Sequence, residues 1–171
     1  MLKRLFSPMS LVSQLAVLML LSTLIGVTGM AVSGWLVQGV QGSAHAINKA
    51  GSLRMQSYRL MSAIPLQEDE QYLLDEMEHT AFSPELALAA KRDGQQAQLA
   101  DLQTYWHNVV IPAIKDARQP AQVAEIIAVF VGRIDKLVSA FDSNTEHRIA
   151  EVVVLHRVMA ILMGLLILLA L

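Results

Sequence analysis

The sequence predicts an all-α protein, an antiparallel four-helix bundle whose first and last helices continue into two transmembrane helices. Composition is the first observation behind this class. Hydrophobic residues make up 54% of the chain, charged residues only 16%, and the mean hydropathy is +0.44, which is more apolar than ordinary soluble domains. Patterning is the second. The apolar excess lies at the two ends, and the sequence between them has helical rather than strand-like spacing.

The first apolar segment begins shortly after Lys3 and Arg4. About 20 apolar residues are enough for a helix to cross a bilayer core, so residues 11–37 are predicted to form transmembrane helix 1. This run is too long for the apolar core of a cleavable signal peptide. Because basic residues favour the cytoplasmic side, residues 1–10 are expected to be a cytoplasmic N-terminus.

The second apolar segment is predicted to be transmembrane helix 2, residues 152–171, and it is interrupted only by His156 and Arg157. It stops at Leu171 without the polar flank that normally anchors such a helix, so we expect the chain to be truncated there. Residues 38–151 are then a four-helix domain on the side of the membrane opposite the N-terminus.

Proline, glycine and capping signals divide this domain into helices. Asp93-Gly94 breaks the chain, and Pro112 is expected to bend the helix that contains it. The first predicted helix is 44–64. The second is 67–80, and it starts again at Ser83-Pro84 and continues to about Arg92. The third is 95–117, and the fourth begins after Pro120 and enters the second span. The fourth has an apolar seam at alternating spacings of four and three, typical of left-handed helix packing. The seam residues are Val123, Ile127, Phe130, Ile134, Leu137 and Phe141.

Helix one, 44–64, has two apolar faces when it is wrapped at about 100° per residue. The first is predicted to fill the core and holds Ala46, Ala50, Leu53, Leu60 and Ile64. The second holds Ala44, Ile47, Gly51, Tyr58 and Met61, with Arg54 among them, and the remaining polar sector holds Asn48, Lys49, Ser52, Gln56 and Arg59. Two apolar faces imply two packing partners, so the second is predicted to pair with the same helix of another copy.

Charge is distributed unevenly. No Asp or Glu occurs before Glu68, although helix one carries Lys49, Arg54 and Arg59. An unneutralised basic helix attracts small anions. Two Arg54 guanidinium groups facing each other across a two-fold axis repel, and a planar oxyanion between them would accept hydrogen bonds from both. The alternative is a structural Arg54 paired with Glu76 or Glu78 of helix two.

The run from Ala50 to Leu60, AGSLRMQSYRL, resembles the P-box of the nitrate/nitrite sensor histidine kinases of the NarX type. The resemblance covers essentially the whole chain. It implies a periplasmic four-helix sensor domain in the bacterial inner membrane, on a multi-pass chain, that dimerises through helix one and binds nitrate or nitrite. It assigns ligand binding to Gly51 and Arg54 of both subunits, and tuning of affinity or anion discrimination to Lys49, Ser52, Met55 and Arg59.

The same resemblance implies that the kinase core lies beyond these residues, together with its ATP, its Mg and its contact with a cytoplasmic response regulator. No catalytic residue and no cofactor is therefore assigned to this segment. Metal binding is disfavoured, since cysteine is absent and Glu76-x-x-His79 is a single, unrepeated pair. The acidic majority after residue 67 and the lack of a recognition motif disfavour nucleic acid as a partner. The lipid bilayer and a second copy are the expected partners.

Two other functions remain open from the sequence. One is a chemotaxis-type receptor input domain that uses the same helical module. The other is a non-signalling, membrane-anchored helical interaction protein in which Arg54 belongs to a structural ion pair. The output of a receptor is decided by sequence that follows the second span.

Overall fold

The computed structural model describes residues 10–170, and the regular elements in that range are all helical. The elements are α2 (Leu11–Ser62), a 3-10 turn (Glu68–Glu70), α3 (Tyr72–Ala81), α4 (Pro84–Asp93), α5 (Gln96–Tyr105), a π-helical turn (Trp106–Val110), α6 (Ile111–Asp116), a second 3-10 turn (Pro120–Gln122) and α7 (Ala124–Ala170). The predicted fold class is confirmed. The expected cytoplasmic N-terminus lies outside the described residues apart from Ser10, and so does Leu171.

The chain divides into two units. The bundle unit is Val40–Glu146, and the span unit consists of the residues up to Gly39 and those from His147 onward. Helices α2 and α7 contribute to both units without a break. Each contains an 18-residue window with a mean hydropathy of 2.2, none of it buried inside the protein. Both helices are therefore long and apolar enough to cross a membrane.

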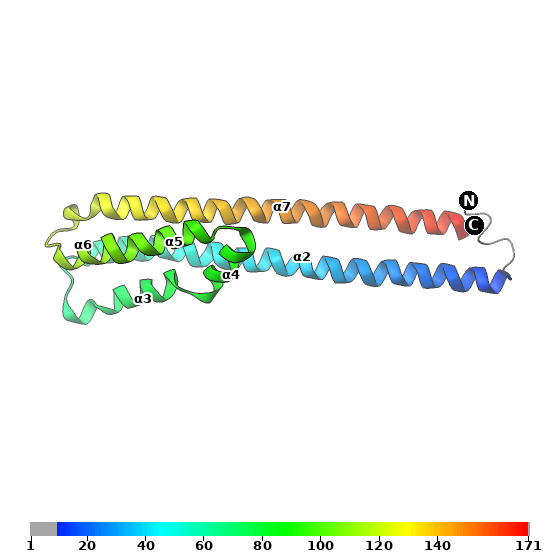
Figure 1. Ribbon diagram of the computed structural model, residues 1–171, viewed down its shortest axis with the longest axis horizontal. Helices are drawn as coiled ribbons and strands as arrows, with labels where there is room; N and C mark the ends of the chain where they lie inside the picture. Colours follow the sequence, from blue (N-terminus) through cyan, green and yellow to red (C-terminus); the bar gives the residue numbers. More distant parts are fainter. Residues whose placement is uncertain (1–9, 171) are drawn as a thin grey trace. The chain divides into compact units, whose positions relative to one another are not determined.

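In the bundle unit, α3 to α6 lie alongside the parts of α2 and α7 that belong to this unit (Figure 1). Helices α3 and α4 together form the second helix of the predicted bundle, and α5 and α6 form the third. Gly94 ends α4 with a φ of 70°, a left-handed conformation that glycine adopts without steric cost. Ser83 precedes Pro84 as predicted, although its side chain makes no capping hydrogen bond.

The third bundle helix contains a wider turn than the simple bend expected at Pro112. Five residues, Trp106–Val110, form a π-helical turn between α5 and α6. Pro112 follows it in the first turn of α6. Because proline cannot donate a backbone hydrogen bond and its ring crowds the preceding turn, the π turn accommodates it by widening the helix just before it.

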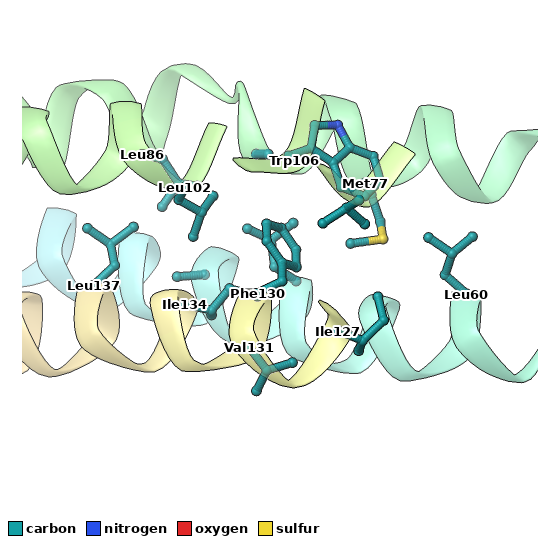
Figure 2. Packing of buried hydrophobic residues seen from close by; sticks show 14 of the residues in the cluster. Leu60, Met77, Leu86, Leu102, Trp106, Ile127, Phe130, Val131, Ile134 and Leu137 are labelled. Carbon is teal, nitrogen blue, oxygen red and sulfur yellow. The ribbon is translucent and has the colours of Figure 1, made fainter. Parts of the chain in front are cut away.

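The hydrophobic core lies where the four helices of the bundle meet. Figure 2 shows Trp106 and Leu102 extending toward Phe130 and Ile134 of α7. The ring centroids of Trp106 and Phe130 are 5.7 Å apart, within the range of favourable aromatic contacts. Every residue of the predicted seam and of the predicted core face of helix one is buried. This packing fixes which side of α2 is left uncovered.

Candidate functional site

The side of α2 turned away from the core carries an uncovered surface. We call it the outer face of α2 and define it as Gly51, Arg54, Met55 and Tyr58. Ile47 and Met61, which were predicted to belong to the same face, are instead partly buried and pack against the core. Met55 is 66% exposed, Tyr58 is 49% exposed, and the Arg54 side chain is 48% exposed. A Cβ atom added to Gly51 would meet nothing within 4 Å. Nothing inside the protomer therefore requires either glycine or a large exposed apolar side chain at these positions.

Ion pairs mark the two edges of the outer face. On the α7 side, Arg54 Nη1 lies 3.4 Å from Asp135 Oδ1. On the α3 side, Arg59 Nη1 lies 3.4 Å from Glu76 Oε2, and its Nη2 donates to the Tyr72 hydroxyl at 3.1 Å. Half-exposed pairs of this length stabilise a fold little. The outer face thus has Arg54 at its edge toward α7, and Arg59 lies just beyond its edge toward α3.

The ion-pair partner predicted for Arg54 was wrong. Glu76 pairs with Arg59, whereas Glu78 accepts a hydrogen bond from the indole N–H of Trp106. Helical geometry explains the difference, because Arg54 and Arg59 are five residues apart and project about 140° apart around the axis. Only Arg59 faces α3, and Arg54 faces α7.

Gln56 is also placed differently from the prediction, which assigned it to the polar sector of helix one. Its side chain is only 7% exposed, and its Nε2 donates to Glu76 Oε1 and to Thr80 Oγ1, both at 3.2 Å. The amide therefore connects α2 with α3. Its Oε1 has no hydrogen-bond partner in the described part of the chain. A polar residue at the margin of an apolar face can turn either way, and the sequence alone does not decide the direction.

The structure separates the predicted site residues into two groups. Gly51, Arg54 and Met55 lie together on the outer face. Lys49, Ser52 and Arg59 lie at helical angles nearer α3, and the Ser52 hydroxyl donates to the Asn48 carbonyl of its own helix at 3.0 Å. The binding and tuning roles of all six stay predictions.

Residues 10–170 contain no cluster of three or more His, Asp or Glu side chains that could hold an ion. The Glu76 and His79 side chains have separate partners, since Glu76 contacts Arg59 and His79 Nδ1 lies 2.8 Å from the Asp75 carbonyl oxygen. The chemistry available at the outer face is therefore hydrogen bonding from a guanidinium beside an apolar surface.

Fold and site together define a class, namely an all-α domain with a half-exposed arginine beside exposed apolar side chains, on a helix that continues into a membrane-length segment. The family model described as Type IV pili methyl-accepting chemotaxis transducer N-term (PilJ) matches residues 35–129. The nitrate/nitrite sensor protein NarX of Escherichia coli K12 is 62% identical over 166 residues, or 97% of this chain and 28% of that protein. The Shigella flexneri protein of the same name gives the same values.

Two solved structures are similar to the chain. The E. coli NarX sensor domain in complex with nitrate has a TM-score of 0.62 at 58% identity, covering 64% of this chain and 96% of that one. The same domain without ligand has a TM-score of 0.56 at 58% identity, covering 57% and 98%. The chain belongs to this family of helical transducer N-terminal domains, and it is a relative of the NarX sensor domain. It spans about 28% of the length of the curated relatives.

Proposed function

We propose that this chain is the input part of a two-component sensor and that it binds nitrate or nitrite at a homodimer interface formed by the outer face of α2. The observation that carries the proposal is that Arg54 and Gly51 lie together on an uncovered face. The contacts inside the protomer do not explain why this face has a glycine and large exposed apolar side chains. The 62% identity to nitrate/nitrite sensors over 97% of the chain supports the choice of ligand.

The chemistry of Arg54 suits a small planar oxyanion. A guanidinium presents several N–H donors in one plane, and it binds planar anions through two parallel hydrogen bonds. A two-fold axis would bring a second Arg54 to the opposite side of the anion, so that four donors could face three oxygens. Gly51, one turn away on the same face, leaves room for a close approach of the partner backbone.

The apolar part of the outer face supports the dimer. Met55 and Tyr58 form an exposed apolar patch that a second α2 could cover, and the same patch on both copies makes the contact isologous. Covering it would remove water from around Arg54 and strengthen the interaction of the guanidinium with an anion. Dimerisation and ligand binding are thus expected to favour each other.

Signalling follows from the continuity of the two long helices. Both α2 and α7 run from the bundle unit into the span unit, so a ligand that favours one arrangement of the bundle can bias the spans. A coupling of about 1–3 kcal/mol is enough to shift such an equilibrium. In the proposed topology the N-terminus is cytoplasmic, residues 38–151 are periplasmic, and the bacterial inner membrane holds both spans. The kinase core, with ATP and Mg, and the response regulator would act beyond this chain.

A chemotaxis-type receptor is the second candidate, and the description of the matching family favours it. That match lies in residues 35–129, the input part, and the same input module can serve different outputs. The identity to NarX extends over 97% of the chain and supports the kinase output instead. Sequence that follows the second span in the gene would decide between the two.

The proposal is tested by titrating nitrate into the full chain in lipid nanodiscs, with isothermal calorimetry as the readout. We expect Arg54→Ala to weaken binding by about 10- to 100-fold, because hydrogen bonds to charged groups contribute about 1.5–3 kcal/mol. Arg118→Ala is the matched control, since it removes an exposed arginine in the turn after α6, and it should leave affinity unchanged. Undiminished affinity in Arg54→Ala would overturn the proposal.

A further inference from the structure

Arg54 is held much more loosely than another arginine of the same bundle. Arg92 donates twice to the Asp93 carboxylate, at 2.8 and 3.0 Å, and once to the Ser43 hydroxyl at 2.7 Å. Arg54 has a single polar contact in the described part of the chain, its 3.4 Å approach to Asp135. Most of the five N–H donors of this guanidinium are therefore open to another acceptor.

The contact between Arg54 and Asp135 is easily exchanged. Its 3.4 Å separation exceeds the roughly 2.7–2.9 Å of a charge-assisted hydrogen bond. The two side chains are 48% and 50% exposed, so water competes for both groups and screens their attraction. Asp135 neutralises Arg54 in part without fixing it in place.

We propose that Asp135 is a built-in competitor for the anion that Arg54 binds. The inference rests on the proposed function. An anion that reaches Arg54 meets a carboxylate already next to the guanidinium, and the two negative groups repel each other. The anion must therefore share the guanidinium at an electrostatic cost or displace Asp135. Asp135 thereby sets the affinity below the value that Arg54 alone would give.

The competition also links binding to the movement of the helices. Arg54 belongs to α2 and Asp135 to α7, the two helices that continue from the bundle unit into the span unit. When the anion replaces Asp135, Arg54 exchanges a contact with α7 of its own protomer for a contact with the ligand. Ligand binding thereby removes one connection between α2 and α7. Asp135 is a positioning residue in this scheme, because it acts on the ligand through Arg54.

The test compares nitrate affinity in the wild-type full chain and in Asp135→Asn, by calorimetry in lipid nanodiscs. Removing a half-exposed charge next to Arg54 should tighten binding about two- to five-fold, the range expected for a surface ion pair. Asp142→Asn is the matched control. It makes the same chemical change on the same face of α7, about 10 Å further along the helix, beyond the roughly 8 Å screening length at physiological salt. It should leave the affinity within about 1.5-fold.

The outcomes separate this inference from the function on which it rests. Tighter binding in Asp135→Asn, with Asp142→Asn near wild type, supports the competitor role. Unchanged or weaker binding in Asp135→Asn, while wild type binds nitrate and Arg54→Ala does not, overturns the competitor role and leaves the proposed function standing. Equal tightening by both variants also overturns it, because a general charge effect would then account for the change. No binding by wild type overturns the proposed function and this inference with it.

Discussion

The inner and outer faces of α2 are part of one helix, yet their residues are explained in different ways. The inner face, Ala46, Ala50, Leu53 and Leu60, is 0% exposed and enclosed by the other bundle helices. The outer face carries a glycine with open space beside it, two large exposed apolar side chains and a loosely held arginine. The protomer accounts for the size of each inner-face residue. It does not account for the glycine or the exposed apolar side chains of the outer face, and the proposed function assigns that face to a ligand and a second copy.

The largest expected loss of stability follows from a substitution on the inner face. Leu53→Ala should lower the free energy of unfolding by about 2–5 kcal/mol, because it removes buried methyl groups and leaves a cavity. Met55→Ala, two residues later on the outer face, should change it by less than about 0.5 kcal/mol. Urea unfolding followed by the fluorescence of buried Trp106, in a Trp35→Phe background, measures both. Equal losses would mean that the two faces do not differ as described.

Gly42 and Gly51 of α2 extend the comparison of the two sides of the helix to glycine positions. They are nine residues apart, so they lie on opposite sides of the helix. A Cβ on Gly42 would collide with the Arg92 guanidinium, which holds the Ser43 hydroxyl. The guanidinium is the far end of a flexible side chain and can shift, so weakening of that hydrogen bond should offset most of the gain in helix propensity, and Gly42→Ala should change stability by less than about 0.5 kcal/mol. Gly51→Ala should raise stability by up to about 1 kcal/mol, since only the propensity changes. Thermal unfolding of both variants without nitrate, at a dilution that keeps the chain monomeric, provides the measurement. A destabilised Gly51→Ala under those conditions would show that the protomer does require glycine there.

The smallest expected difference in stability is the one between substitutions of the two arginines beside the outer face, Arg59 and Arg54. Arg59→Ala should lower stability by about 1 kcal/mol, because Arg59 contacts Glu76, the Tyr72 hydroxyl and the Tyr72 ring. Arg54→Ala should lower it by no more than about 0.5 kcal/mol, since one half-exposed contact is lost. The same unfolding assay distinguishes them. A larger loss for Arg54→Ala would favour a structural role for that residue.

Sequence periodicity was enough to predict the apolar core residues on the inner face of α2 and along the seam of α7. The seam from Val123 to Phe141 and the inner face of α2 follow helical spacing, and the structure buries all of them. Burial on a periodic face depends mainly on the helix itself, so one sequence suffices to find it. The breaks at Ser83-Pro84 and at Asp93-Gly94 were predictable for a similar reason, because backbone restrictions of proline and glycine are local.

Contacts between helices could not be predicted in the same way. The partner of Arg54 is Asp135, which depends on how α2 and α7 are rotated and aligned against each other. The buried position of Gln56 depends on the placement of Thr80 on α3. The π turn at Trp106–Val110 could have been anticipated only as a disturbance before Pro112. The predicted site residues were found through composition and family resemblance, whereas the competitor Asp135 became visible only in the structure.

The central claim is that the residues of the outer face are determined by a ligand and a partner rather than by the fold. The measurement that tests it most directly is nitrate calorimetry on the full chain carrying Gly51→Ala, with thermal unfolding of the same variant without nitrate at a dilution that keeps it monomeric. We predict a chain at least as stable as wild type whose nitrate affinity is at least about 10-fold weaker, because an added methyl group blocks close approach at Gly51. An equally stable chain with wild-type nitrate affinity would contradict the account.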